Sequence, residues 1–369
     1  MSHLFSPFQL GPVRLSNRII VSPMCQYSAD DGVASDWHLQ HLIQLGYSGA
    51  GLVMVEATGV ERRGRITHQC LGLYSEPCEA ALSRVLAAAR RFTSADARFG
   101  IQLAHAGRKA SVYRPWDERH GPLGPGDDPW PAVGPSPAAF DPAWPVPEAL
   151  DEDGLERIRE AFASSAKRAV RIGFDAIELH AAHGYLLHEF LSPVANQRTD
   201  SYGGSLENRM RFPLAVARAV RGATPSRVAL GVRITGADWL PGGWTIEDAV
   251  AFVRALREEG TDFVCVSSGG ISPAVAIPVE PGYQVPFAAK VRHETGIATQ
   301  AVGMILKPEQ AEEIIASGKA DMVTLARTFL DDPRWVWHAA ERLGGSVYYP
   351  PQYARASRSA WPGAALLRP

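Results

Sequence analysis

The sequence predicts a single α/β domain over residues 1–369, a (β/α)8 TIM barrel. Short apolar runs alternate with longer stretches of helical periodicity along most of the chain, and their number matches the eight strands of such a barrel. Hydrophobic residues make up 46% of the sequence, enough to bury a large core. A doubly wound sheet is the alternative, but a glycine-rich turn usually follows its first strand. Here Ser22-Pro23-Met24-Cys25 follows instead, which favours the barrel.

The expected strands are short runs of branched and apolar residues. They are Arg18–Ser22, Leu52–Glu56, Phe99–Ala104, Ala176–His180, Ala229–Ile234, Phe263–Ser267, Thr299–Val302 and Met322–Leu325. The expected helices have apolar residues three and four positions apart. They are Glu79–Phe92, Leu155–Ile172, Leu206–Val220, Ile246–Glu259, Val285–Glu294 and Pro308–Ser317.

Three segments fall outside this alternation. Residues Phe8–Leu15, interrupted by Gly11-Pro12, predict a small hairpin that plugs the bottom of the barrel. Residues 113–147 are rich in proline and tryptophan, which predicts an ordered capping excursion after the third strand, over the barrel mouth. Residues 348–369, rich in proline, arginine and aromatic residues, predict a C-terminal extension lying across a surface.

Charge and cysteine content limit the classes of function. Lys and Arg total 37 against 39 Asp and Glu, a net charge of −2, so neither nucleic acid nor a membrane is an expected partner. Residues 1–17 lack the apolar segment of a signal peptide, and no run is apolar enough to span a bilayer. The 4 cysteines show no C-x-x-C spacing, which argues against a zinc ribbon or an iron–sulfur cluster. We expect a cytoplasmic enzyme without a metal.

In a TIM barrel the reacting groups lie at the carboxyl ends of the strands. At those positions the sequence offers polar, small and sulfur-containing residues, few of which are typical of a core. They are Pro23, Met24, Cys25, Ala57, Gln102, His180, His183, Tyr185, Arg233, Gly303, Ala326 and Arg327.

His180 and His183 allow three interpretations. They could be zinc ligands, but no H-E-x-x-H motif and no third ligand accompany them. They could be structural histidines whose hydrogen bonds are satisfied inside the protein. The interpretation we favour is a pair of donors that grip an oxygen atom of a bound substrate.

Four further residues indicate a flavin mononucleotide site. Gly303 follows the seventh strand and Arg327 opens the helix after the eighth, and barrels often bind phosphate between these two loops. A surface ion pair is the alternative role for Arg327. Arg233, at the end of an apolar strand, needs an anionic group to meet it, and Gln102 offers a donor and an acceptor to a flat heterocycle. No Ser-His-Asp order, paired carboxylates or G-x-x-x-x-G-K motif suggests a hydrolase or a kinase.

Four motifs in order resemble the old yellow enzyme family, specifically its bacterial, cysteine-containing, thermophilic-like class of ene-reductases, which includes the xenobiotic reductases. The resemblance extends from Leu4 to about Tyr353. The motifs are Pro23-Met24-Cys25-Gln26-Tyr27, Gln102-Leu103-Ala104-His105-Ala106-Gly107-Arg108-Lys109, His180-Ala181-Ala182-His183-Gly184-Tyr185 and Arg198-Thr199-Asp200-Ser201-Tyr202-Gly203-Gly204-Ser205-Leu206-Glu207-Asn208-Arg209.

The resemblance implies an FMN cofactor with NADPH as hydride donor. Ala326 stands where the family has glycine before its phosphate-binding arginine, a departure that keeps the backbone N–H. The residues matched to FMN binding are Ser22, Pro23, Met24, Cys25, Ala57, Gln102, Arg233, Gly303, Ala326 and Arg327, and those matched to substrate binding are Tyr27, His180, His183 and Tyr185.

The resemblance also implies a mechanism. Flavin N5 would pass a hydride from NADPH to an activated alkene in ping-pong turnover, with small α,β-unsaturated carbonyl or nitro compounds as substrates. His180 and His183 would polarise the alkene through its oxygen, and Tyr185 would protonate the α carbon. Cys25 would lie against the flavin and modulate its potential.

The C-terminal Gln352-Tyr353-Ala354-Arg355 resembles a family ending that crosses a dimer interface and inserts its arginine into the neighbouring active site. This predicts a homodimer or homotetramer in which Arg355 binds substrate. The alternative is a solvated arginine in a frayed tail.

Three other functions remain to be weighed. A tRNA dihydrouridine synthase would need a basic face. A 2,4-dienoyl-CoA reductase would need a cysteine cluster and a second domain, and the chain has neither. A non-catalytic or redox-sensing flavin-binding barrel using Cys25 is the main alternative, against which Tyr185 beside two histidines argues.

Overall fold

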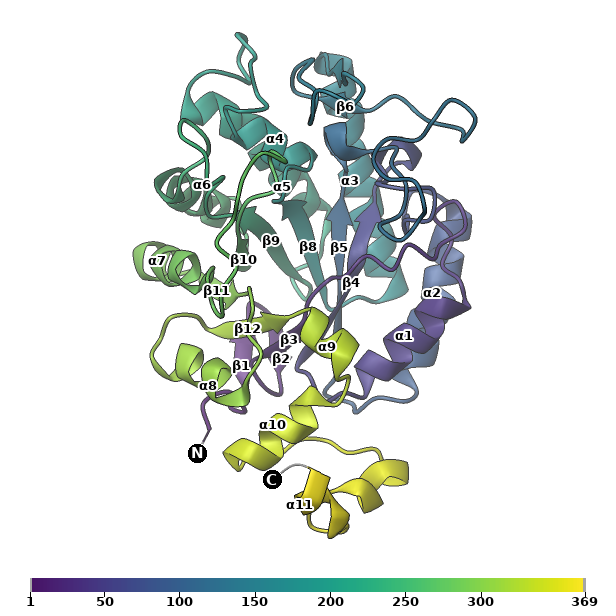
Figure 1. Cartoon of the computed structure of the whole chain (residues 1–369), viewed down its shortest axis with the longest axis vertical. Helices are drawn as coiled ribbons and strands as arrows, with labels where there is room; N and C mark the ends of the chain where they lie inside the picture. The colour runs from purple at the N-terminus through teal and green to yellow at the C-terminus, as the bar shows by residue number, and fades with distance from the viewer. Residues whose placement is uncertain (1, 368–369) are drawn as a thin grey trace.

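A computed structural model describes residues 2–367 and has the predicted architecture. Eight parallel strands form a closed barrel in the order β10-β11-β12-β3-β4-β5-β8-β9, and helices surround it (Figure 1). The strands are β3 (Ile19–Val21), β4 (Leu52–Gly59), β5 (Arg98–Ala104), β8 (Ala176–Ala181), β9 (Ala229–Thr235), β10 (Phe263–Ser267), β11 (Ala298–Ala301) and β12 (Met322–Leu325).

The six predicted helices all form, with ends that differ from the predicted ones by a few residues. They are α2 (Glu76–Arg90), α3 (Glu152–Ile172), α5 (Leu206–Ala223), α6 (Ile246–Glu258), α7 (Val285–Thr295) and α8 (Pro308–Ala316). The helix expected to open at Arg327 is α9 (Arg327–Asp331). The helices without a predicted counterpart are α1 (Asp36–Gly46), α4 (Leu186–Leu191), α10 (Trp335–Leu343) and α11 (Gly363–Leu367), and short 3-10 segments lie at η1 (Arg62–Gly64), η2 (Gly107–Lys109) and η3 (Pro351–Ala356).

Local chemistry explains where the helices begin and end. In α3 the side chain of Asp151 accepts a hydrogen bond from the backbone N–H of Gly154, which caps the first turn. The helix ends at Gly173, whose φ of 97° is a left-handed conformation that glycine adopts without strain. Thr245 caps α6 in the same way and forms a capping box with Asp248.

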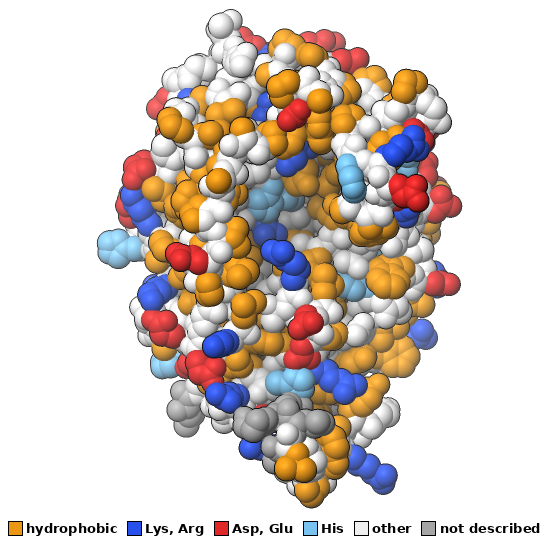
Figure 2. Space-filling model, in the orientation of Figure 1, with side chains coloured by type: hydrophobic (Ala, Val, Ile, Leu, Met, Phe, Trp, Pro, Cys, Tyr) orange, Lys and Arg blue, Asp and Glu red, His pale blue; other side chains and the backbone are white. Residues whose placement is uncertain are grey.

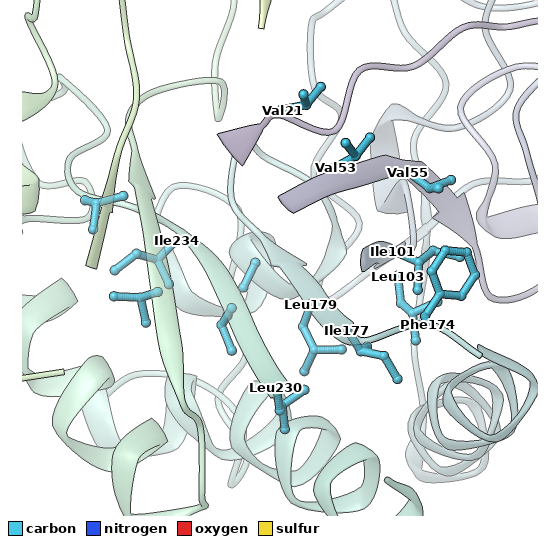
Figure 3. Packing of buried hydrophobic residues seen from close by; sticks show 14 of the residues in the cluster. Val21, Val53, Val55, Ile101, Leu103, Phe174, Ile177, Leu179, Leu230 and Ile234 are labelled. Carbon is cyan, nitrogen blue, oxygen red and sulfur yellow. The ribbon is translucent and has the colours of Figure 1, made fainter. Parts of the chain in front are cut away.

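Alternate side chains of the strands point outward and pack under the helices. Figure 3 shows this layer, in which Val55, Ile101 and Ile177 are in register on three neighbouring strands and Phe174 lies beside Ile101. These side chains are almost completely buried. The layer fastens the helices to the barrel and so fixes the strand ends that carry the site.

The lower barrel interior is a separate apolar cluster, closed by the hairpin. Strands β1 (Phe8–Leu10) and β2 (Val13–Leu15) pair antiparallel, and Leu10 and Leu15 pack against interior residues such as Ile20 and Phe263. Gly231 lies opposite Phe263 in the register of β9 and β10, and a Cβ on it would meet the Phe263 ring at 2.2 Å. The predicted plug is therefore confirmed.

The excursion and the C-terminal segment are both ordered. Within the excursion, β6 (Val133–Gly134) pairs with β7 (Glu148–Ala149), while Trp130 donates from its indole nitrogen to the Arg63 carbonyl at 2.8 Å. In the C-terminal segment, drawn yellow at the lower end of Figure 1, Tyr353 stacks on Tyr47 with ring centroids 5.8 Å apart. Among the described residues no helix is long and apolar enough to cross a membrane.

Candidate active site

Polar side chains fill the upper interior of the barrel and continue into the loops above it. Figure 2 shows histidine and basic side chains in the middle of this face, set among hydrophobic ones. The predicted histidines lie at one end of this region: His180 is the fifth residue of β8 and points into the barrel mouth, and His183 lies in the loop that follows. The loop is tight, since His183 itself has a φ of 59°.

The two histidine rings face each other. Nε2 of His180 lies 3.4 Å from Nδ1 of His183, and the rings are nearly perpendicular with centroids 5.1 Å apart. Nδ1 of His180 accepts from the Ala182 backbone N–H at 3.2 Å, so the ring proton of a neutral His180 is on Nε2. Nε2 of His183 lies 2.6 Å from the hydroxyl of Ser267, which can donate or accept.

Burial sets the protonation of these groups. Burial, with Arg233 and Lys109 as further causes, holds the pKa of His180 well below its usual value. The same desolvation and nearby charges lower the pKa of His183. Both rings are therefore neutral at pH 7 and serve as hydrogen-bond donors without a full charge.

Tyr185 is the third predicted catalytic residue, after His180 and His183. Its ring packs edge-on against His180 with centroids 4.9 Å apart. Burial raises the pKa of its hydroxyl, so the phenol keeps its proton at neutral pH. The Lys109 ammonium lies 5.0 Å from the Tyr185 ring centroid and donates to the His183 carbonyl at 2.9 Å. Lys109 lies in the loop after β5. It therefore holds this loop against the loop after β8, called the reactive loop because it carries His183 and Tyr185.

Gln102, Glu178 and Arg233 form the buried floor of the site. The amide nitrogen of Gln102 donates to Glu178 at 2.7 Å, and burial raises the pKa of that carboxyl. Arg233 is 8% exposed, and the hydrogen bond of its guanidinium within residues 2–367 is to the Ser22 hydroxyl at 3.4 Å. Its Nε has no partner, and no carboxylate among the described residues lies within ion-pair distance of the group. A buried cation in this state needs an anionic or acceptor group from a ligand.

The predicted phosphate cradle lies beside this floor. Gly303 has a φ of 112°, and a Cβ there would lie 2.6 Å from the amide nitrogen of Gln284, so only glycine fits. Arg327 is the first residue of α9, with Ala326 as its N-cap. Arg327 is exposed, and among residues 2–367 it forms no ion pair, so the alternative of a surface ion pair has no support.

These observations fit a flavin mononucleotide. The cradle offers a free arginine and helix N–H groups for one phosphate. The floor offers the buried guanidinium of Arg233, whose Nε has no partner among the described residues, and a Gln102 amide for the polar edge of a flat ring system. Beyond the predicted residues, the described part of the interior holds an unpartnered amide nitrogen, that of Gln300, whose oxygen accepts from the hydroxyl of Thr324 at 2.7 Å.

The loop after β3 carries the remaining predicted residues. Ser22 is buried and its N–H donates to the Leu325 carbonyl at 2.8 Å, while Pro23, Met24 and Cys25 are partly buried. Burial raises the pKa of the Cys25 thiol well above its usual value, with Cys70 and Glu56 as lesser causes. A thiol in this state is a weak nucleophile.

Two structural features of this region escaped the sequence analysis. A bulge in β4 between Val55 and Ala57 places Ala57 opposite Gln102 in the register. Tyr27 has a φ of 46° and meets Trp116 of the excursion edge-on, with centroids 5.5 Å apart. The excursion thus reaches the substrate side of the site.

Arg355 is the one predicted site residue that the folded chain does not bring to the others. It is exposed in η3, and its neighbour Tyr353 packs on Tyr47 and lies 4.9 Å from the guanidinium of Arg334. Its predicted role requires a second subunit and stays a prediction.

Sequence reasoning also missed positioning residues. Lys109 stands inside a motif that the resemblance used, but no role followed from its position. Ser267 ends a predicted strand, and its contact with His183 depends on two strands that are far apart in the sequence. The sequence signal that could have found Ser267 is its position at the end of a barrel strand. The same signal located His180.

Comparisons with known proteins agree with this geometry. The model of the NADH:flavin oxidoreductase / NADH oxidase family matches residues 3–344. The NADPH dehydrogenase of Geobacillus thermodenitrificans is 43% identical over 357 residues, which cover 96% of this chain and 98% of that protein. The NADH:flavin oxidoreductase FG08077 of Gibberella zeae is 43% identical over 361 residues, which cover 93% of this chain and 86% of that protein. The solved structure of morphinone reductase superposes with a TM-score of 0.76 at 28% identity, over 95% of this chain and 92% of the other.

Proposed function

The chain belongs to the NADH:flavin oxidoreductase / NADH oxidase family, and from this premise we propose that it is an NADPH-dependent ene-reductase. It is a flavin-dependent oxidoreductase of the old yellow enzyme family, with FMN as its cofactor and a reduced nicotinamide as hydride donor. Our proposal adds the preference for NADPH and the substrate class. That class is the activated alkene, in which a carbonyl or nitro group is conjugated to the C=C bond.

One observation carries the proposal: two neutral histidines face each other across 3.4 Å with a protonated tyrosine packed against them. Nε2 of His180 donates to the substrate oxygen. Nδ1 of His183 donates to the same oxygen when the Ser267 hydroxyl donates to His183 Nε2. Two donors on one oxygen stabilise the negative charge that develops there when the β carbon receives a hydride.

Tyr185 supplies the proton. Its hydroxyl stays protonated because burial raises its pKa, and the α carbon of an enolate is basic enough to remove that proton. FMN, when bound, supplies the hydride chemistry between the nicotinamide and the alkene. Arg233, buried and in no ion pair among the described residues, would hold negative charge on the flavin ring, and Arg327 with the N–H groups of Gly303 and Ala326 would hold its phosphate.

The direct test is NADPH oxidation by the purified holoenzyme with 2-cyclohexenone, maleimide and a nitroalkene, repeated with NADH. We expect turnover with all three and a higher kcat/KM with NADPH. Flavin reduction by NADPH without turnover of any alkene would contradict the proposal. A redox-sensing role for Cys25 is the alternative, and the raised pKa of its thiol weighs against it because reactive cysteines have lowered pKa values.

We also propose a homo-oligomer in which Arg355 reaches the site of a second copy. The C-terminal segment is anchored on the outside of the barrel by Tyr353 and leaves the Arg355 side chain exposed. An exposed arginine held on an ordered segment is suited to bind an oxygen or phosphate of a ligand in a neighbouring site. Neither nucleic acid nor a membrane is a partner in this proposal.

A further inference from the structure

A pair of buried side chains beneath the reactive loop contacts the peptide between His183 and Tyr185. The N–H of Gly184 donates to Nδ1 of His188 at 2.8 Å. Nε2 of the same ring lies 3.1 Å from Oδ1 of Asp238. His188 and Asp238 are both fully buried, and among the described residues neither Nε2 nor Oδ1 has a hydrogen-bond partner, so their 3.1 Å contact is an ion-pair contact.

These contacts fix the tautomer of His188. Because Nδ1 accepts a hydrogen bond from Gly184, it carries no proton. The proton of the neutral ring is therefore on Nε2, the nitrogen that lies 3.1 Å from the Asp238 carboxylate. Burial disfavours that carboxylate, but His188 together with hydrogen bonds from Ser192 and Trp244 lowers the pKa of Asp238 overall, so it is ionised.

The other carboxylate oxygen fixes the orientation of Asp238. Oδ2 accepts from the Ser192 hydroxyl at 2.6 Å and from the Trp244 backbone N–H at 2.8 Å. Two donors on Oδ2 leave Oδ1 as the acceptor for His188. The pair therefore links the loop after β9 and helix α4 to the loop after β8.

Gly184 has little room to move away from this link. A Cβ on it would lie 2.2 Å from the Gly270 carbonyl oxygen, so the backbones already touch. The preceding N–H, that of His183, donates to the Thr235 hydroxyl at 3.1 Å. A change at His188 Nδ1 is thus transmitted to the two side chains on either side of Gly184.

We infer that Asp238 and His188 are positioning residues for the proposed reduction: Asp238 selects the His188 tautomer that accepts from Gly184, and this holds His183 and Tyr185 in place. The inference rests on the proposed function for its kinetic part only. The tautomer is a property of the folded protein and is measured without any substrate.

Asp238→Asn is the sharpest test because it preserves size and inverts one hydrogen bond. The amide oxygen of the new side chain must face the Ser192 and Trp244 donors, so its NH2 group faces His188. His188 Nε2 then has to accept, which moves the ring proton to Nδ1, against the Gly184 N–H. A similar aspartate-to-asparagine inversion in a serine protease triad leaves the geometry intact but has a large rate effect.

The first measurement is the ¹⁵N spectrum of histidine-labelled holoenzyme, with the His188 signals assigned by their loss in His188→Leu. We expect an unprotonated Nδ1 in the wild type and a protonated Nδ1 in Asp238→Asn. The second measurement is the rate of the alkene half-reaction with pre-reduced enzyme. We expect it to fall about 100-fold, the effect of an ångström-scale misplacement of reacting groups.

Two control variants separate positioning from general stability. Ser192→Ala removes one of the two donors to Asp238 Oδ2 and leaves the Trp244 N–H in place, so the His188 tautomer should stay and the alkene rate should fall much less than in Asp238→Asn. Asp332→Asn breaks another Asp–His contact, that of Asp332 Oδ2 with His338 Nδ1 at 2.6 Å, on the outer helices, and should have no effect. Equal losses in Ser192→Ala and Asp238→Asn, or an unchanged tautomer in Asp238→Asn, would overturn the inference.

If Asp238→Asn does not fold, His188→Asn and His188→Leu replace it. Both leave Asp238 without its partner, but only asparagine keeps an acceptor oxygen near the Gly184 N–H. We expect a faster alkene half-reaction in His188→Asn at equal flavin content, and equal rates would contradict the inference. If the wild type reduces no alkene, the proposed function fails, while the wild-type tautomer still decides the inference.

Discussion

Single residues in this site depend on the protonation that burial imposes on them. His180 and His183 are kept neutral, whereas Tyr185 is kept protonated, and these are opposite effects on pKa from the same desolvation. Each group therefore stands in the state that donates a hydrogen bond or a proton. Lys109 shows the limit of this effect: burial lowers its pKa to about 8, so it remains largely charged at pH 7.

Tyr185→Phe should slow the alkene half-reaction by about 100-fold or more, the usual contribution of a general acid. Reduction of the flavin by NADPH should change much less, because that half-reaction needs no proton from Tyr185. Stopped-flow measurements of the two halves separate these effects. Equal slowing of both would show that Tyr185 has another role.

Glu189→Gln should stabilise the protein more at pH 8 than at pH 5. Burial raises the pKa of Glu189 to about 8, with Arg108 as an opposing cause, so the folded state holds a proton that the unfolded state loses above its own pKa of 4.5. Wild-type stability therefore falls by about 1.4 kcal/mol per pH unit in this window from Glu189 alone, and glutamine has no such loss. Thermal unfolding of both proteins from pH 5 to 8 tests this; a constant difference would contradict it.

At the scale of elements, loops that follow the strands bring the functional groups together, and short helices orient them. The turn after β11 needs Gly303, and α9 starts at Arg327, as the sequence analysis expected. The excursion contributes Trp116, whose side chain is 58% exposed beside Tyr27. The exposed side chains of Arg327 and Trp116 are therefore available to ligands as a cation and an aromatic surface.

Arg327→Ala should weaken FMN binding by about 1.5–3 kcal/mol, because a charge-assisted hydrogen bond to the phosphate is lost. Fluorescence titration of the apoenzyme with FMN measures the effect. Arg334→Ala is a matched control, since Arg334 follows α9 and packs on Trp337 instead of lying in the cradle. Equal affinities in Arg327→Ala and the wild type would remove Arg327 from the cradle.

At the scale of the whole molecule, one barrel supplies every predicted site residue except Arg355. The apolar lower interior, closed by the hairpin, supports the polar upper interior. The excursion covers one side of the mouth, and the C-terminal segment packs on the outside near α1 and α10. In the homo-oligomer that we propose, Arg355 of a second copy would complete the site.

Arg355→Ala should raise the KM for alkenes without loss of bound flavin, and the wild type should be at least a dimer. The physical reason is that Arg355 would offer its charge to the ligand and not to the cofactor. Light scattering and steady-state kinetics check the two parts, with Arg358→Ala as a nearby exposed control. A monomeric wild type, or unchanged kinetics in Arg355→Ala, would contradict the proposal.

The sequence by itself determined the barrel, because buried strands and amphipathic helices are local patterns and their alternation leaves few topologies. It also located His180, Arg233 and Arg327, since residues at the ends of parallel strands converge at one face. It did not predict α1, although Leu39, Leu42 and Ile43 of that helix recur at helical spacing. Only the tertiary structure decided the contacts of His183 with Ser267 and of His188 with Asp238. These contacts join segments 50 or more residues apart. The lengths of the contacts and the tautomers of the two histidines depend on how the strands pack, and no local sequence pattern contains that information.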